Sequence, residues 1–317
     1  MNINKLIGNT PMIKIKLKYK EKTINVFAKL EYYNYTGSIK DRLANYIINE
    51  GYKENKLKKN MPIIEATSGN TGIAFAALGA YYNHPVHIFI PDFVSEERIK
   101  ILKLYGANIH LIYNGGFQAA IKKADELSKK INGFRPNQFS NIKNIEVHYK
   151  TTGKEITDKL KDIDLFVSGI GTGGTLMGIA RRIKKHNKKA KIIALQPKQL
   201  PILTEPGYIG RHQIEGIGDD FIPQLIDMNL IDNIVTVNDE DAINMSRILA
   251  KNFGLGVGIS SGANLIAAAL AGENKSNVVT IFADDLKKYL STNLGNKINH
   301  NKDFISNNIK ILSIDYI

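Results

Sequence analysis

The chain has 317 residues, of which 43% are hydrophobic, and this is enough to bury one or two sizeable cores. It contains no cysteine, which excludes disulfides and thiolate metal sites. No apolar run approaches the ~20 residues that span a bilayer, and the first residues lack the basic-then-apolar layout of a secretory signal. We therefore expect a cytoplasmic protein that does not enter a membrane.

The chain is basic, with 43 Lys and Arg against 30 Asp and Glu and a net charge of +13. Such a charge can indicate nucleic-acid binding. Here the lysines are spread over several segments and alternate with acidic or apolar residues, which is typical of solvated helix faces. We expect no nucleic-acid partner, and only a modest general attraction for anionic metabolites.

Apolar, strand-like runs alternate with helix-like stretches along most of the chain. This alternation predicts an α/β fold with largely parallel sheets and helices on both faces. A polar loop over 132–150 indicates a crossover between domains, and the tail after Asn293 ends in a strand-like run of unknown role. The predicted strands and the helices that follow them are 61–66 with 70–82, 85–90 with 95–106, 107–112 with 116–130, 164–170 with 175–186, 190–197, 233–239 with 240–254, and 278–284 with 285–293.

The first motif in the chain is TGSIKDR, over 36–42, where Lys40 falls in the first turn of a predicted helix. Surrounding structure can desolvate a lysine at such a place and make its amine nucleophilic, as an aldehyde cofactor requires. The alternative is an ordinary surface lysine.

Three further loops each join a strand or an apolar segment to a predicted helix. The loop TSGNTG (67–72) offers hydroxyls and backbone N–H groups at a positive helix end, which suits a carboxylate or a phosphate, although an N-capping loop without ligand is the alternative. The loop GIGTGGT (169–175) contains G-x-G-x-x-G, but Gln196 stands where a dinucleotide site needs an acid, so we prefer one phosphate monoester. The third loop, GISSGAN (258–264), reads on its own as a helix cap.

Together these loops resemble the cysteine synthase family of fold-type-II pyridoxal-phosphate enzymes, which also includes cystathionine β-synthase. The resemblance runs in the family's order over nearly the whole chain, through IGNTPMIKI, AKLEYYNYTGSIKDR, IIEATSGNTGIA, NQFSN, HYKTTGKEI, GIGTGGT, EGIGDDFIP, GISSGAN and YLST. It implies a fold like that of the tryptophan synthase β-subunit, with a smaller mobile domain over 40–146 and a larger domain from 1–39 and 147–317. It also implies a pyridoxal 5′-phosphate cofactor, a homodimer and small amino-acid substrates, and it leaves a serine acetyltransferase partner open.

The resemblance also assigns roles to individual residues. Lys40 matches the Schiff-base lysine and the base at Cα, Asn70 the partner of the cofactor's phenolic oxygen, and Ser260 the partner of the pyridine nitrogen. A hydroxyl at that nitrogen weakens the electron sink, which favours elimination at the β-carbon followed by addition of a nucleophile. The phosphate loop matches Gly171, Thr172, Gly173, Gly174 and Thr175, and the substrate-carboxylate site matches Thr67, Ser68, Thr71 and Gln138.

The chain departs from its relatives at two acidic places. The segment with Asp219 and Asp220 resembles a family segment that has small neutral residues at these two positions in cysteine synthases and Tyr-Asp in cystathionine β-synthases. The alternatives are a surface acid for Asp219 and a loop cap for Asp220. Ala283–Asp285 replaces a turn of the Pro/Ser/Gly type, and the sequence predicts no function for it.

The implied reaction is β-replacement on a serine- or cysteine-type amino acid through an aminoacrylate intermediate. One version makes L-cysteine from O-acetylserine and sulfide; the other consumes L-cysteine, releases hydrogen sulfide and yields lanthionine, cystathionine or serine. Asp219 and Asp220 favour the second, because a carboxylate ~5 Å from HS⁻ repels it by roughly 3 kcal/mol at an effective dielectric constant near 20. The non-enzymatic alternative is a basic nucleotide-binding protein. The histidines form no H-E-x-x-H motif, so we expect no metal.

Overall fold

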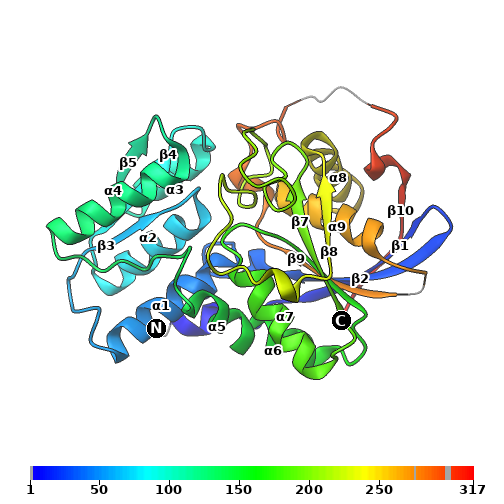
Figure 1. Cartoon of the computed structure of the whole chain (residues 1–317), viewed down its shortest axis with the longest axis horizontal. Helices are drawn as coiled ribbons and strands as arrows, with labels where there is room; N and C mark the ends of the chain where they lie inside the picture. Colours follow the sequence, from blue (N-terminus) through cyan, green and yellow to red (C-terminus); the bar gives the residue numbers. More distant parts are fainter. Residues whose placement is uncertain (1–2, 275, 297–300) are drawn as a thin grey trace.

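A computed structural model describes residues 3–274, 276–296 and 301–317. It contains two sheets of unequal width that lie side by side (Figure 1). The wide sheet has seven strands, in the order β10 (Ile309–Tyr316), β1 (Met12–Tyr19), β2 (Lys22–Leu30), β9 (Asn277–Phe282), β6 (Leu165–Gly169), β7 (Lys191–Pro197) and β8 (Asn233–Val237). The narrow sheet has three, in the order β3 (Ile63–Ala66), β4 (Val86–Pro91) and β5 (Asn108–Ile112).

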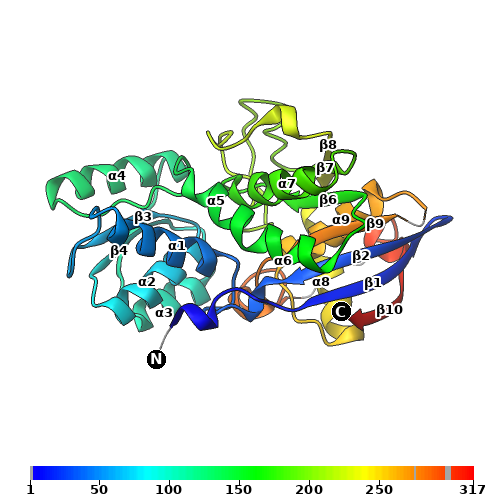
Figure 2. The same cartoon turned by 90° about the horizontal axis from the view of Figure 1, so that it is seen from below.

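Helices cover both faces of the narrow sheet, whose strands are all parallel (Figure 2). Ile63 and Ile88 pack on the side of α1 (Lys40–Lys53), α2 (Asn70–Tyr82) and α3 (Glu96–Leu104), whereas Ile64 packs against α4 (Gly116–Lys130). Successive strand side chains point to opposite faces, so each strand serves both layers. This explains why the strands read as continuous apolar runs.

The wide sheet is parallel from β2 to β8 and antiparallel at its other edge, where β1 pairs with both β2 and β10. Helices α8 (Asp239–Phe253) and α9 (Ile259–Ala271) cover one face, and α7 (Gly174–His186), α5 (Lys143–Lys150) and α6 (Thr152–Lys159) lie on the other. The short 3-10 helices are η1 (Ile3–Leu6), η2 (Glu31–Tyr33), η3 (Met228–Leu230), η4 (Leu286–Lys288) and η5 (Ile305–Asn308).

The α/β prediction is confirmed, with corrections to individual elements. The strand-like tail is β10, which completes the antiparallel edge. The expected loop over 132–150 ends at α5, and the helix expected over 285–293 is only the short η4 followed by turns. The strands of the narrow sheet all fall within 40–146 and those of the wide sheet outside it, although a boundary at 146 would cut α5. The division into a mobile and a larger domain stays a proposal.

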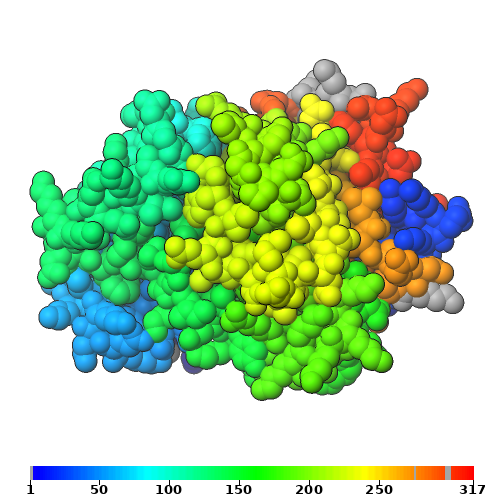
Figure 3. Space-filling model, in the orientation of Figure 1, coloured from blue at the N-terminus to red at the C-terminus, as the bar shows by residue number. Residues whose placement is uncertain are grey.

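The space between the sheets collects the carboxyl ends of several parallel strands, which is where α/β folds place their ligands. The chain leaves β3 into the 67–71 turn and β6 into the 170–173 turn. Strand β9 ends beside both turns. The long segment 198–232, green to yellow in the space-filling view, covers the front of this region (Figure 3). Among the helices of the described ranges, none is long and apolar enough to cross a membrane.

Candidate active site

One pocket between the two sheets gathers all but two of the residues expected from the sequence. Its lining includes Lys40, Thr67, Ser68, Asn70, Thr71, Gln138, Gly171, Thr172, Gly173, Thr175, Asp219 and Ser260. Gly174 lies directly behind this lining as the first residue of α7, and Asp220 stands at the surface beside it. Segments distant in the chain are therefore brought together as the motifs predicted.

Lys40 is the first residue of α1, and its backbone is fixed to the end of β9. The N–H of Ile39 donates to the carbonyl oxygen of Ala283 at 2.9 Å, and Ser38 forms a β-bridge with Asp284. Burial lowers the pKa of Lys40, and the carboxylates of Asp219 and Asp284 offset part of this effect. A desolvated lysine of this kind is a good nucleophile for an aldehyde.

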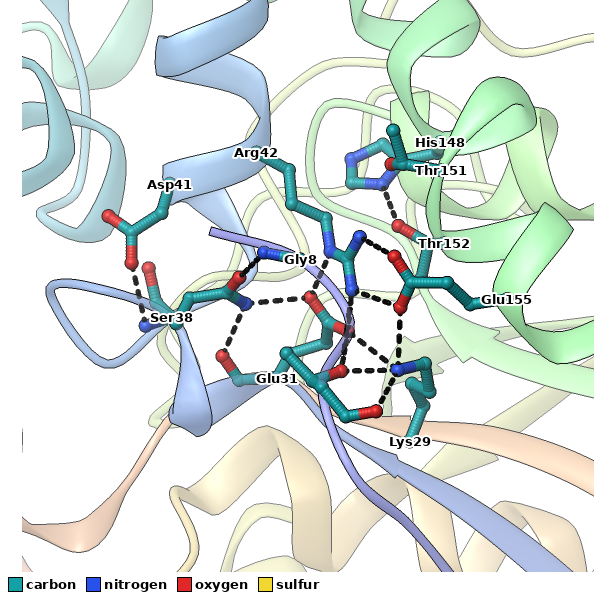
Figure 4. A network of polar contacts seen from close by, with 12 residues as sticks. Gly8, Lys29, Glu31, Ser38, Asp41, Arg42, His148, Thr151, Thr152 and Glu155 are labelled. Atoms are coloured by element: carbon teal, nitrogen blue, oxygen red, sulfur yellow. Dashed lines mark hydrogen bonds and ion pairs between the residues drawn. The ribbon is translucent and has the colours of Figure 1, made fainter. Parts of the chain in front are cut away.

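A buried ion network anchors the helix that carries Lys40 (Figure 4). Arg42, in the first turn of α1, donates to both carboxylate oxygens of Glu31 at 2.6 and 2.8 Å and to both of Glu155 at the same two distances. Lys29 lies 2.8 Å from Glu155. The network joins β2, η2, α1 and α6. It therefore holds the first turn of α1, which carries Lys40, against the wide sheet.

The 67–71 turn forms the N-terminus of α2, as an anion site requires. Gly69 has a φ of 147°, and a Cβ there would lie 2.1 Å from Cδ of Arg98, so only glycine fits. Thr71 Oγ1 donates to Gln138 Oε1 at 2.7 Å, and Gln138 Nε2 donates to the carbonyl oxygen of Ala66 at 2.8 Å. These bonds bring Gln138 to the helix end, in agreement with its expected place.

The 171–175 loop forms a close-fitting cradle at the N-terminus of α7. A Cβ on Gly171 would lie 2.5 Å from the carbonyl oxygen of Gly216, and one on Gly174 would lie 2.0 Å from Oδ1 of Asn144. Asn144 Nδ2 donates to Thr172 Oγ1 at 2.9 Å. Backbone N–H groups, two threonine hydroxyls and a helix N-terminus make a donor set that suits a phosphate monoester.

Two buried side chains near this loop have supporting roles. Gln196 is bonded through Nε2 to Thr204 Oγ1 at 2.8 Å and accepts from the Leu203 N–H at 2.9 Å, so it ties a loop to β7. His148 Nε2 lies 3.3 Å from Thr175 Oγ1. Burial lowers the pKa of His148 to about 3, which keeps the ring neutral, and it orients Thr175 without adding a charge.

The pocket fits pyridoxal phosphate on observations independent of the motifs. Asn70 Oδ1 is buried without a hydrogen-bond partner among the described residues, while its Nδ2 donates to Asp284 at 2.7 Å. A buried acceptor without a partner indicates a missing hydrogen-bond donor, such as a protonated cofactor hydroxyl. Lys40 supplies the amine, the 171–175 loop the phosphate cradle, and Ser260, in the first turn of α9, a hydroxyl at another helix end.

The two acids at 219 and 220 occupy different environments. Asp219 lines the pocket; burial raises its pKa to about 7, the carboxylate of Asp220 adds to the rise, and Lys40 opposes it. Asp220 is exposed, and its Oδ2 would lie 2.8 Å from a Cβ on Gly116, which places it against the N-terminus of α4. The structure therefore brings Asp219 to the reacting groups and leaves Asp220 outside the lining.

Sequence reasoning missed three groups around the pocket. Glu215 and Phe139 belong to the lining, and Arg98, 1% exposed on α3, forms an ion pair with Glu215. Arg98 follows two glutamates in the first turn of α3, and nothing in this charged local sequence indicates that it is buried. Glu215 directly precedes GIGDDF, so its place beside that loop was the one available signal.

Residues 3–284 match the family model described as pyridoxal-phosphate dependent enzyme. The chain belongs to this family. It is 41% identical over 297 residues to cysteine synthase B of Campylobacter jejuni, an alignment that covers 92% of this chain and 97% of the relative. This pyridoxal-phosphate enzyme is therefore a member of the cysteine synthase family, a β-replacement enzyme, and the non-enzymatic alternative is wrong.

Solved structures of related enzymes agree with the fold. A hydrogen sulfide-producing enzyme from Fusobacterium nucleatum superposes with a TM-score of 0.94 at 46% identity, over 99% of this chain and 97% of that one. A variant of the same enzyme, with an aspartate replaced by asparagine and in complex with an α-aminoacrylate intermediate, matches with the same TM-score and identity over 98% and 97% of the two chains. The fold-type-II prediction is confirmed.

Proposed function

We propose that this enzyme consumes L-cysteine, releases its sulfur as hydrogen sulfide and adds a second nucleophile at the β-carbon. The observation that carries the proposal is Asp219, a carboxylate in the pocket, close enough to Lys40 to perturb its pKa, with its own pKa raised to about 7. The likeness to a hydrogen sulfide-producing enzyme supports it.

Each half of the reaction uses different side chains. Bound at Lys40, pyridoxal phosphate supplies the electron sink that stabilises negative charge at Cα. Lys40 removes the Cα proton once its amine is free, and the 67–71 turn with Gln138 holds the substrate carboxylate. The C–S bond then breaks with its electron pair on sulfur, and the departing HS⁻ takes a proton from solvent to leave as hydrogen sulfide. Lys40 keeps the Cα proton and returns it to Cα when the new bond forms at Cβ. Asp219 removes a proton from the second nucleophile as the new bond forms at Cβ.

A pKa near 7 suits Asp219 to this role, since a general base works best when its pKa lies near the operating pH. The same pKa weakens the repulsion argument, because about half of the Asp219 side chains are protonated at pH 7 and do not repel HS⁻. General-base action on the nucleophile therefore supports the proposal better than exclusion of HS⁻ does. Water as nucleophile gives serine; a second cysteine gives lanthionine, and homocysteine gives cystathionine.

The test gives the enzyme L-cysteine alone, then O-acetylserine with sulfide, and compares kcat/KM for the two reactions. We expect L-cysteine turnover to be faster in the wild-type enzyme. Asp219→Asn should release about one hydrogen sulfide per active site in a burst and then slow strongly, because the second half has lost its base. Asp220→Asn, on the neighbouring exposed acid, is the matched control and should keep steady release of hydrogen sulfide; its charge adds to the raised pKa of Asp219, so its pH profile should shift slightly to lower pH. Faster cysteine synthesis from O-acetylserine, unchanged in Asp219→Asn, would refute the proposal.

The second candidate is an O-acetylserine sulfhydrylase that makes L-cysteine. The likeness to cysteine synthase B favours it. The nucleophile of that reaction, HS⁻, is already ionised and needs no base. The reaction therefore gives Asp219 no catalytic role. The same comparison of kcat/KM decides between the two reactions.

Further expectations from the sequence belong to the proposal. We propose that residues 40–146 move as the smaller domain and close the 67–71 turn over the substrate carboxylate, which shields the reacting carbon from water. The homodimer and the cytoplasmic location stay predictions; a serine acetyltransferase partner is compatible with the family but is not predicted.

A further inference from the structure

Asp284 is a buried carboxylate at the end of β9, in the turn to which the sequence assigned no function. It is 1% exposed. Its Oδ2 accepts from Asn70 Nδ2 and from the Tyr289 hydroxyl, both at 2.7 Å, and lies 3.8 Å from the guanidinium of Arg98. A buried carboxylate is costly unless hydrogen bonds and charges compensate for its lost hydration; here these gather on Oδ2, and Oδ1 has no hydrogen-bond partner among the described residues.

The backbone holds Asp284 rigidly beside the catalytic lysine. Its carbonyl oxygen accepts from the Gly258 N–H at 3.0 Å, and its bridge to Ser38 puts it on the same turn that leads into Lys40. A Cβ on Gly258 would lie 2.0 Å from Asp284 Oδ1, so α9 packs directly against the other carboxylate oxygen. The carboxylate therefore has a fixed position, against which side chains from the helices on the narrow sheet can be oriented.

Asn70 is one such side chain, because it begins α2 and reaches across to Asp284. An ionised carboxylate accepts hydrogen bonds and cannot donate them, so Asn70 must turn its Nδ2 toward Asp284. The amide has then one allowed orientation, and its buried Oδ1 is left without a partner among the described residues. With a neutral amide at position 284, Asn70 would lose the charged acceptor that holds its Nδ2, and the turned amide would no longer present its Oδ1 to the pocket.

Arg98, on a helix packed against the narrow sheet, is the second side chain that reaches Asp284. Its guanidinium lies 4.6 Å from the ring centroid of Tyr289 and pairs with Glu215, and its stem fills the space beneath Gly69. Asp284 thus contacts two side chains that flank the 67–71 turn, one from α2 and one from α3.

We propose that Asp284 is a positioning residue for the cofactor pocket, which acts by fixing the orientation of the Asn70 amide relative to Lys40. This proposal concerns the cofactor and holds whichever nucleophile the enzyme uses. Asp284 acts through Asn70. Removing the charge of Asp284 therefore weakens the binding of pyridoxal phosphate without removing any group that contacts the cofactor. Arg98 keeps α3 against the same carboxylate and limits how far the turn can shift.

The experiment measures the dissociation constant of pyridoxal phosphate from cofactor-stripped protein, by titration of visible absorbance. Asp284→Asn should weaken binding by about ten-fold or more, the usual effect of losing a hydrogen bond to a charged group. Asp285→Asn is the matched control, since this neighbouring acid bonds the Lys287 N–H and should stay within about two-fold of wild type. Equal affinities for the two variants would overturn the proposal.

A double-mutant cycle tests whether Asp284 acts through Asn70. In an Asn70→Ala background, Asp284→Asn should weaken binding by less than about two-fold, because its target is gone. A full ten-fold loss in both backgrounds would show a direct effect on Lys40 or the fold, and would overturn the proposal.

A swapped pair, Asn70→Asp with Asp284→Asn, keeps the assay decisive if Asp284→Asn does not fold. The swap restores one amide–carboxylate bond and so restores folding, as thermal unfolding of the cofactor-stripped protein would report. It turns the charge toward the pocket, so cofactor affinity should stay at least about ten-fold weaker than wild type. Wild-type affinity in the swapped enzyme would assign Asp284 a structural role alone.

Discussion

The raised pKa of Asp219 predicts how the stability of the cofactor-stripped protein depends on pH. Burial moves this pKa from 3.8 to about 7. Because the pKa is higher in the folded state, the folded protein binds this proton more tightly, and stability is lost as pH rises from about 4 through about 7. At 1.36 kcal/mol per unit the loss has a ceiling of about 4 kcal/mol. Asp219 keeps some exposure toward the pocket, so we expect about 2 kcal/mol.

Replacing Asp219 by Asn removes this penalty while keeping the shape of the side chain. Urea unfolding at pH 5 and pH 8 should therefore show Asp219→Asn gaining about 2 kcal/mol over wild type at pH 8 and clearly less at pH 5. Asp220→Asn, where the side chain is exposed, should show a much smaller pH-dependent change. If wild type and Asp219→Asn differ by the same amount at both pH values, the carboxylate is not held at a raised pKa and the argument for a base poised near neutrality is lost.

Lys40→Ala should abolish turnover together with the absorbance near ~410 nm of cofactor bound to a lysine, and wild-type rates in this variant would exclude Lys40 as the cofactor lysine. Gln138→Ala should lower turnover with little loss of bound cofactor, since its amide serves the substrate-carboxylate turn; Ser68→Ala should behave alike, and full activity in both would move that site elsewhere. Arg42→Met should destabilise the protein by about 3–5 kcal/mol in urea unfolding, because Glu31 loses a buried partner, and a change below about 1 kcal/mol would show that the network in Figure 4 is dispensable.

The parallel part of the fold was predictable because its signal is local. Each strand of the narrow sheet and each of β6 to β9 is a short apolar run bounded by loop residues. The antiparallel edge was not predictable in the same way. There β1 pairs with β10, so that Ile13 lies opposite Tyr316, at nearly the full length of the chain. Helices α5 and α6 were missed because each spans only eight residues, which is too short for a pattern rich in polar residues to stand out from a loop.

The residues of the site differ in the same way, because some have a local signal in the sequence and others do not. Its glycine turns were visible because turn residues stand next to one another in the chain, whereas Lys40 was assigned by its match to the family motif; the fold brings these segments to one pocket. The contacts of Asp284 were invisible because each joins residues far apart in the chain, such as Asn70, whose partnership no local pattern encodes. Burial of Arg98 is likewise a property of the packed molecule, since its helix carries charged residues on its exposed face.

Lys40 thus stands between two carboxylates whose environments differ, and the difference separates their tasks. Asp219 faces the pocket with a pKa of about 7, so it can change its charge during turnover, as a base for the nucleophile must. Asp284 accepts hydrogen bonds from an amide and a phenol and lies 3.8 Å from a guanidinium, and these contacts suit a fixed positioning role. Both raise the pKa of Lys40 against the effect of burial. A loss at Asp219 should therefore appear in the pH profile and in the second half of the reaction, and a loss at Asp284 in cofactor affinity, because only the first group has to exchange a proton.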